Sequence, residues 1–290
     1  MAVSLPILGA HMSMAGGFHR AIERGSDVGC RCVQIFVKNN NQWRAAALAD
    51  AEVDQFQAAV RRYDLRHLLA HSSYLINLAS PDRTLWKKSL DALIVELHRA
   101  ERLGIPHVVL HPGAHTTGSL QAGLRRVVRA LDEIHRQTRG LRVMCLLENT
   151  AGQGTCLGWQ FEQLATMLDG VRDPERLGVC FDTCHAFAAG YPLASEAEYG
   201  QTIGQFQRLV GLRRIKAIHL NDSKRECGSR VDRHEHIGRG RVGIGAFRRL
   251  LNDGRLRRVP MYLETPKGDD PRSGRPWDVV NLRRLRRLVE

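Results

Sequence analysis

Short apolar runs alternate with longer amphipathic segments along nearly the whole chain. Eight runs are rich in Val, Ile and Leu. Several are continuously apolar, which is typical of parallel strands that are buried on both faces. The expected strands are residues 5–11, 32–37, 67–72, 107–113, 142–150, 177–185, 215–222 and 259–266.

Segments with helical periodicity separate these runs. The clearest covers 81–103, where apolar residues recur at spacings of four and three. Ser80 suits its N-cap, Pro81 its first helical position and Gly104 its end. The other expected helices are 15–29, 50–63, 119–138, 160–169, 196–210, 244–253 and 276–289.

Eight strands that alternate with eight helices are typical of an α/β protein of the (β/α)₈ TIM-barrel type. We expect a single domain over residues 1–290, a length that such barrels commonly reach. A doubly wound open sheet is the alternative. No Gly-rich dinucleotide fingerprint follows the first expected strand, which weakens this alternative.

The composition is that of an ordinary soluble globular protein, with 43% hydrophobic and 25% charged residues. No apolar run reaches transmembrane length, and the N-terminus lacks the basic segment of a secretory signal. The seven cysteines show no framework spacing, and most lie in apolar runs. We therefore expect reduced cysteines and a cytoplasmic protein without a membrane partner.

The charge balance is strongly basic, with a formal net charge of +13. Such an excess favours an anionic partner, and nucleic acid is the leading candidate. General solubility charge is the alternative, because the arginines are spread widely. The densest cluster, 282–288, has helical spacing and predicts an amphipathic closing helix with a solvated basic face.

Residues that can bind a metal follow the ends of most expected strands, and in TIM barrels these ends meet at one mouth. Glu148 and Glu264 each end an apolar run, where a carboxylate is costly to bury unless it is paired or coordinated. A single histidine of this kind is more often a hydrogen-bonded core residue. Nine converging residues instead predict a metal centre. They are His71, His111, Glu148, Asp182, His185, His219, Asp232, His234 and Glu264.

The segment 215–238 shows this pattern most densely. An apolar run with His219 near its end is followed by a polar loop that presents Asp232 and His234. Alternate side chains of extended backbone point the same way, so these two can face one ion. Nine ligands exceed one tetrahedral site and would hold about three ions with open positions. Three divalent ions against four carboxylates leave a positive site, which would attract an anion such as phosphate.

Several long motifs match a known family between about residue 7 and residue 266. The main ones are HSSYLINLA (71–79), GVCFDTCHAFAAGY (178–191) and HLNDSKRECGSRVDRH (219–234), supported by LHPGAH (110–115) and LLENTAGQG (146–154). On these motifs the chain resembles endonuclease IV, the zinc-dependent apurinic/apyrimidinic endonuclease family of base excision repair. The resemblance implies a (β/α)₈ barrel with three Zn²⁺ ions, with Mn²⁺ as an alternative at some sites.

The resemblance also implies how the ligands are shared. One zinc would be held by His71, His111 and Glu148, a second by Glu148, Asp182, His219 and Glu264, and a third by His185, Asp232 and His234. His236 and Glu235 are left out. The implied reaction hydrolyses the phosphodiester 5′ to an abasic site and leaves a 3′-hydroxyl and a 5′-deoxyribose phosphate. Glu148 and Glu264 are the catalytic candidates that orient the nucleophile or take its proton, and the family also removes 3′-blocking groups.

The same resemblance implies contacts to double-stranded DNA that contains abasic sites or blocked 3′ ends. Tyr74 and Leu75 would wedge into the duplex beside the lesion, although both could simply pack in their loop. The expected DNA-binding residues are Lys38, Asn41, Arg44, Tyr74, Leu75, Arg230 and Arg233. The last two could instead belong to a solvated loop.

Two positions depart from the family pattern. Asn41 stands where the family has an arginine that enters the groove, and Ser72 stands where an aspartate is common. The first change puts one minor-groove contact in doubt, for which Arg44 or Lys38 could compensate. The second leaves the ligands in place but could loosen a bond behind one of them.

A sugar isomerase or epimerase with the same barrel is the alternative function. It would need neither a third metal, nor the tyrosine–leucine wedge, nor a strong basic excess. A non-catalytic DNA- or metal-binding descendant is disfavoured because no implied ligand is missing. On family grounds we expect a monomer.

Overall fold

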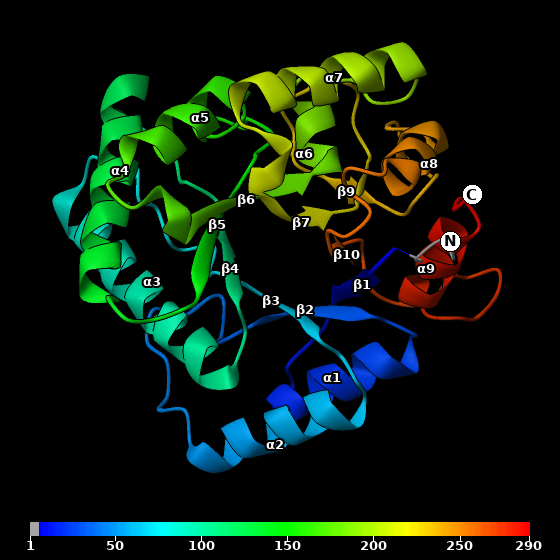
Figure 1. Cartoon of the computed structure of the whole chain (residues 1–290), viewed down its shortest axis with the longest axis horizontal. Helices are drawn as coiled ribbons and strands as arrows, with labels where there is room; N and C mark the ends of the chain where they lie inside the picture. Colours follow the sequence, from blue (N-terminus) through cyan, green and yellow to red (C-terminus); the bar gives the residue numbers. More distant parts are fainter. Residues whose placement is uncertain (1–5) are drawn as a thin grey trace.

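Eight parallel strands close into one barrel in the computed structural model, which describes residues 6–290 (Figure 1). The barrel strands are β1 (Leu8–His11), β2 (Cys32–Phe36), β3 (His67–His71), β4 (His107–Leu110), β5 (Met144–Glu148), β6 (Leu177–Asp182), β7 (Ile215–His219) and β10 (Met261–Leu263). Each pairs with the next along the chain, and β10 returns to β1. The predicted (β/α)₈ barrel is confirmed, and the doubly wound alternative is wrong.

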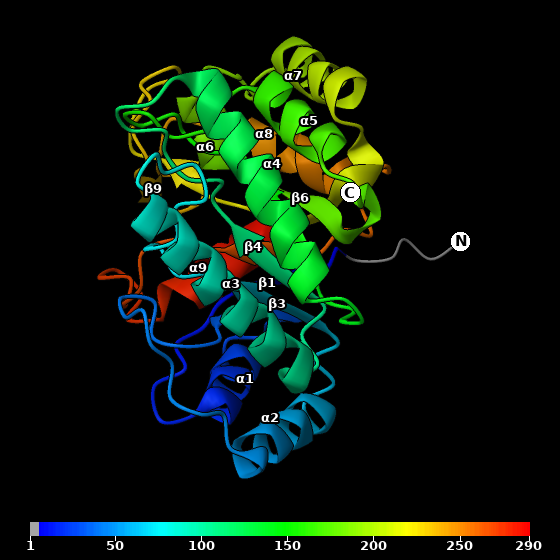
Figure 2. The ribbon, with the colours of Figure 1, turned by 90° about the vertical axis from the view of Figure 1, so that its left-hand side faces the viewer.

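Helices surround the barrel as an outer ring, and one short, buried helix follows β6 directly at the end of that strand (Figure 1). They are α1 (Phe18–Asp27), α2 (Asp50–Arg62), α3 (Arg83–Leu103), α4 (Leu120–Gln137), α5 (Phe161–Gly170), α6 (Thr183–Ala188), α7 (Glu196–Leu209), α8 (Ile244–Asn252) and α9 (Trp277–Arg286), with short 3₁₀ turns at Pro174–Arg176 and Leu212–Arg214. Figure 2 shows α3 and α4 lying side by side on the outside. All eight predicted helices are present, with ends shifted by a few residues.

Two details of the predicted elements are wrong, one at the start of a helix and one at the end of a strand. The N-cap of α3 is Asp82 rather than Ser80, because the Asp82 carboxylate accepts hydrogen bonds from the backbone N–H groups of the first turn, and helical backbone starts at Arg83. The predicted strand 177–185 also runs too far. Its last residues form α6, which begins when Asp182 accepts a hydrogen bond from the backbone N–H of His185 at 2.7 Å.

The barrel is apolar on both sides of its strands, which explains the continuous hydrophobic runs. Outward side chains pack against the helices in one large core. A second cluster has one member from each of seven strands, namely Cys32, Leu69, Val109, Leu146, Cys180, Ala217 and Tyr262. Because these residues are separate from the outer core, we place them inside the barrel, where they close it beneath the mouth.

Two further expectations, on the cysteines and on the closing helix, agree with the structure. All seven cysteines are unpaired, and the five in apolar runs are buried. In α9 and the residues after it, Leu282, Leu285 and Leu288 are buried while Arg283 and Arg287 are exposed, as an amphipathic closing helix requires. Among residues 6–290, no helix has the length and apolar character needed to cross a membrane.

Candidate metal centre

Eight side chains form a ring at the mouth of the barrel, one from each strand and most of them from its end. Most stand two positions beyond a member of the inner cluster, as Glu148 follows Leu146 and His219 follows Ala217. Alternate residues of a strand point to the same side, so these side chains turn inward above the cluster. The ring consists of His11, Gln34, His71, His111, Glu148, Asp182, His219 and Glu264.

Four groups of potential ligand atoms lie at this mouth, and three of them consist of histidines and carboxylates alone. The structure brings together His71, His111 and Glu148; Glu148, Asp182, His219 and Glu264; and His185, Asp232 and His234. Within each group the ligand atoms lie within 4.8 Å of one another. All nine predicted residues are therefore close together, in the grouping that the family resemblance implied.

Glu148 lies at the centre of the arrangement and is fully buried. One carboxylate oxygen, Oε2, is 3.4 Å from His71 Nε2 and 3.2 Å from His111 Nε2. The other, Oε1, is 3.0 Å from His219 Nδ1 and 3.1 Å from His185 Nδ1. The two oxygens thus face different histidines, as a carboxylate shared between two ions would.

The second group is held by two buried asparagines that the sequence reasoning missed. Asn221 donates from Nδ2 to Asp182 Oδ2 at 2.7 Å and accepts from the backbone N–H of Glu264 at 2.8 Å. Asn149 bonds the backbone N–H and carbonyl of Asp182. An asparagine at a strand end looks like a turn residue in sequence, so its role depends on tertiary contacts.

The third group joins α6 to the long loop after β7. His185 Nε2 is 3.2 Å from Asp232 Oδ2, and His234 Nε2 is 3.4 Å from Asp232 Oδ1. Two short antiparallel strands, β8 (Asp222–Ser223) and β9 (His234–Glu235), fold this loop back over the barrel mouth. Residues far apart in sequence therefore meet at one position.

The carboxylate of Asp222 holds this loop in place. It accepts hydrogen bonds of 2.8–3.0 Å from the backbone N–H groups of Ser223, Gly238, Gly240 and Val242. Gly240 has no room for a side chain, because a Cβ there would lie 2.4 Å from the carbonyl oxygen of Ser223. One buried carboxylate thereby connects both ends of the loop.

Backbone carbonyls orient three of the histidines, including His185, whose Nδ1 lies 2.9 Å from the carbonyl oxygen of Asn149. His71 Nδ1 lies 2.8 Å from the carbonyl oxygen of Ser72, and His234 Nδ1 lies 3.2 Å from that of Glu264. A carbonyl only accepts, so Nδ1 carries the hydrogen, and in the neutral ring Nε2 presents its lone pair to the centre. Because Ser72 acts here through its backbone, the serine leaves this bond to His71 intact.

Several buried polar atoms of the centre make no hydrogen bond within the described residues. They are Glu148 Oε2, His185 Nε2 and His234 Nε2. Each lies 3.2–3.4 Å from an ion-pair neighbour, but a buried polar atom that makes no hydrogen bond costs about 1–3 kcal/mol. A cation in each group would satisfy these atoms, and imidazole nitrogens with carboxylate oxygens are a ligand set that zinc accepts. The residues present therefore fit a metal centre.

Opposite charges at the centre shift the pKa values of neighbouring side chains. Burial would raise the pKa of Glu148, but the neighbouring charges of His219 and His111 hold it well below its usual range. Burial would lower the pKa of His219, but the negative groups around it, including Glu264, raise it well above its usual value. His219 therefore holds a proton that a bound cation would have to displace.

Two nearby side chains are not among the expected ligands. Cys184 lies close to Asp182 and His234, and burial raises the pKa of its thiol to about 12. His236 stacks on Trp277 with ring centroids 3.7 Å apart. This placement agrees with leaving His236 out of the expected ligands.

Exposed side chains beside the mouth include several of the predicted DNA contacts. Tyr74 is 59% exposed, and its ring centroid lies 5.3 Å from that of His71. Leu75 is partly buried next to it, while Asn41 and Arg44 are exposed on the loop after β2. These four residues are accessible to a ligand that approaches the centre.

Lys38 is not placed as a DNA-contacting residue would be. It is 4% exposed, and its ammonium lies 3.4 Å from the buried carboxylate of Glu96 and donates to the carbonyl oxygen of Asn39. Glu96 also accepts from the backbone N–H of Ser73, and burial raises its pKa to about 7 against the opposing charge of Lys38. Lys38 fastens two loops together instead of reaching outward, so it is not available to replace the missing arginine.

The two predicted arginines of the long loop are both exposed. The guanidinium of Arg230 lies 3.9 Å from the ring centroid of Trp159. Arg233 donates from Nη1 to the carbonyl oxygen of Asp232 at 2.6 Å. Both arginines therefore flank a residue of the third ligand group.

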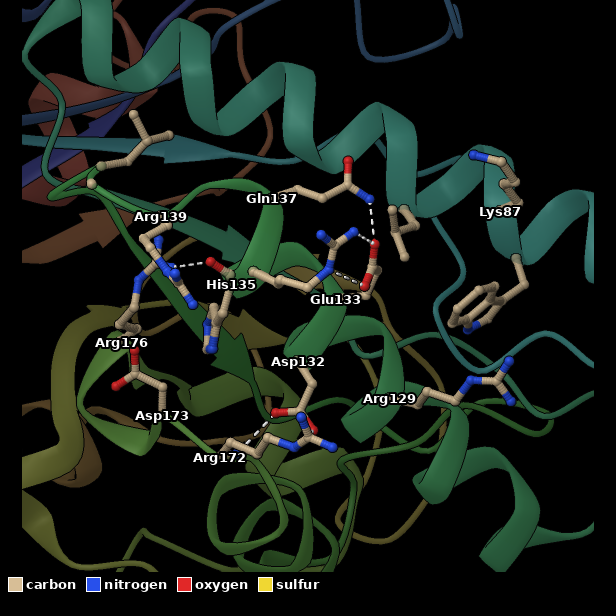
Figure 3. Close-up of a pocket in the computed structure, with 15 residues that line it drawn as sticks. Lys87, Arg129, Asp132, Glu133, His135, Gln137, Arg139, Arg172, Asp173 and Arg176 are labelled. Atoms are coloured by element: carbon tan, nitrogen blue, oxygen red, sulfur yellow. Dashed lines mark hydrogen bonds and ion pairs between the residues drawn. The ribbon is translucent and has the colours of Figure 1, made fainter.

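A cavity of about 770 Å³ lies elsewhere, along α3, α4 and the segment before β6 (Figure 3). Its lining shares no residue with the ligand groups. Arg176 donates to the carbonyl oxygens of His135 and Thr138, and Arg136 pairs with Glu133. These contacts fasten the C-terminal end of α4, which is a structural role.

A parallel barrel with such His/Asp/Glu groups at its mouth defines a metal-dependent barrel enzyme. A family model described as the xylose isomerase-like TIM barrel matches residues 22–285. The chain is 48% identical to the probable endonuclease 4 of Trichlorobacter lovleyi over 281 residues, 97% of this chain and 99% of that one. The crystal structure of endonuclease IV from Thermus thermophilus superposes with a TM-score of 0.84 at 39% identity, covering 98% of each chain. The chain therefore belongs to the endonuclease IV family of hydrolases.

The family assignment confirms the resemblance carried by the sequence motifs. A D-tagatose 3-epimerase-like protein also superposes, with a TM-score of 0.73 at 18% identity over 97% of this chain and 96% of that chain. At that identity the likeness shows a shared fold alone. The isomerase or epimerase alternative is thus the more distant interpretation.

Proposed function

We propose that this protein is a zinc-dependent DNA repair endonuclease. It would hydrolyse the phosphodiester on the 5′ side of an abasic site in duplex DNA, leaving a 3′-hydroxyl and a 5′-deoxyribose phosphate, and would also clear blocked 3′ ends. Family membership supports the reaction class. The observation that carries the proposal is the set of three adjoining ligand groups at one barrel mouth.

The proposal assigns one zinc ion to each group, with Glu148 shared between the first two. Bound there, the ions would supply an activated water near neutral pH and neutralise charge on the phosphate. Buried ligand atoms that make no hydrogen bond, in the first and third groups, support the assignment.

Glu148 and Glu264 are the proposed catalytic carboxylates. Their depressed pKa values keep both in the charged, proton-accepting form at neutral pH. Glu148 is fully buried and surrounded by histidines, which suits an orienting role. Glu264 retains some exposure, as side-chain access by a substrate requires.

The rim of the mouth supplies the proposed DNA contacts. Tyr74, with Leu75 beside it, is the wedge candidate because it stands exposed over His71. Arg44, Arg230 and Arg233 would contact phosphates, which fixes the register of the duplex. Asn41 is exposed in the same loop as Arg44 and offers an amide in place of a cation.

The experiment is cleavage of a labelled duplex that carries one abasic site. The zinc-loaded protein should nick the strand immediately 5′ to the lesion, and the new end should prime DNA synthesis because it is a 3′-hydroxyl. A chelator should abolish nicking, and an undamaged duplex serves as the control. Incision on the 3′ side, or turnover of a ketose in place of nicking, would contradict the proposal. A monomeric state and a cytoplasmic location stay predictions.

A further inference from the structure

Gln34 occupies the ring of inward-facing residues, yet it belongs to none of the ligand groups. It comes from β2 and is fully buried. Its amide contacts three neighbours in the ring. Oε1 lies 2.7 Å from His219 Nε2, while Nε2 lies 2.5 Å from Glu264 Oε1 and 2.9 Å from His11 Nδ1.

The chemistry of these neighbours determines how the amide is oriented. A charged carboxylate only accepts hydrogen bonds, so the amide nitrogen of Gln34 must face Glu264. The amide oxygen then faces His219 and accepts from its Nε2–H. The same amide nitrogen has a second hydrogen, which points to His11 Nδ1 at 2.9 Å.

This contact reverses the orientation of His219 relative to other histidines of the centre. His71 and His234 place Nδ1 on backbone carbonyls and present Nε2. His219 places Nε2 on Gln34 and presents Nδ1, at 3.0 Å from Glu148 Oε1 and 3.2 Å from Glu264 Oε2. The ring nitrogen that His219 offers therefore depends on Gln34.

The two carboxylate oxygens of Glu264 also have different partners. Its Oε1 is held by Gln34, and its Oε2 faces His219 Nδ1. One amide thus restrains two members of the second ligand group at once.

We infer that Gln34 is a positioning residue that fixes which nitrogen of His219 and which oxygen of Glu264 face the bound ion. The inference rests on the proposed metal centre and adds a residue that holds it. Partners of this kind typically contribute about 10–100-fold to metal affinity.

The test compares Gln34→Met, which keeps side-chain length but removes all three amide contacts, with Gln55→Met on the exposed face of α2 as the matched control. Zinc affinity is measured by chelator competition, without DNA. Gln34→Met should bind its weakest zinc about 10–100-fold less tightly, and the control should match the parent protein. Zinc affinity equal to that of the parent protein in Gln34→Met would overturn the inference. A lower melting temperature would not change this conclusion if the zinc affinity stays the same.

A second readout follows the histidine itself. Long-range ¹H–¹⁵N spectra of the zinc-loaded parent should contain a histidine with a protonated Nε2 and a metal-bound Nδ1. Gln34→Met should move or broaden that signal, and its persistence unchanged would overturn the inference.

If Gln34→Met does not fold, Gln34→Glu replaces it. This variant has nearly the same volume but sets a carboxylate oxygen against Glu264, so its zinc affinity should also fall by about 10-fold or more. Parental affinity there would again overturn the inference. These readouts need no DNA, so they test the role of Gln34 separately from the proposed reaction. If the variants bind zinc more weakly but the parent protein does not nick abasic duplexes, the proposed reaction is refuted and the role of Gln34 stands.

Discussion

Glu264 offers one carboxylate oxygen to the second ligand group and the other to Gln34. Glu264→Gln keeps the shape but removes the charge and replaces one acceptor by a donor. We predict a fall in single-turnover nicking of abasic duplex of at least about 100-fold. Duplex affinity, measured by fluorescence anisotropy, should stay within about threefold, because the rim contacts remain. Nicking at the parental rate would rule out the ligand assignment, and Glu175→Gln on an exposed turn is the control.

Glu96 is a second informative residue, because its pKa of about 7 exceeds the ordinary value of 4.5. Between these values the folded protein holds a proton that the unfolded chain has lost, so stability falls as the pH rises from about 4.5 to about 7. Glu96→Gln should remove this contribution, on the order of 2–3 kcal/mol. Urea unfolding of both proteins at pH 5 and pH 7.5 measures the difference, and identical pH dependence in the two would contradict the account.

At the scale of the element, the loop between β7 and α8 depends on Asp222. This carboxylate accepts four backbone hydrogen bonds and so positions Asp232 and His234. Asp222→Ala should loosen the third ligand group and reduce the zinc content by about one ion per chain. Elemental analysis after dialysis checks this, with Asp54→Ala on α2 as the control. Full zinc content in Asp222→Ala would show that the loop needs no such anchor.

The elements differ in how far sequence alone could predict them. Long helices were predictable because one buried face imposes a period on the sequence, and strands because burial on both faces gives continuous apolar runs. The ligand positions follow from the alternation of side chains along each strand. α6 and the β8–β9 pair were missed, since each depends on a specific hydrogen bond or pairing rather than a period. Lys38 was misplaced because its partner, Glu96, lies far away in the sequence. Gln34 was missed because an amide inside an apolar run carries no charge signal.

At the scale of the whole molecule, the chain carries a formal net charge of +13. Neutralised phosphates release counterions, so the logarithm of the DNA affinity should fall linearly with the logarithm of salt concentration, with a slope steeper than about −3. The melting temperature should change little over the same range. Anisotropy titrations between about 50 and 200 mM salt test this, and a flat response would argue against phosphate contacts at the rim.

The central claim is that one folded barrel binds three zinc ions and uses them to cleave DNA at abasic sites. The most direct test measures metal content and nicking on one purified sample. We predict about three zinc ions per chain and incision 5′ to the abasic site, both lost on chelation and both restored by zinc. A sample that holds a single ion, leaves abasic duplex intact and interconverts ketoses would contradict the account.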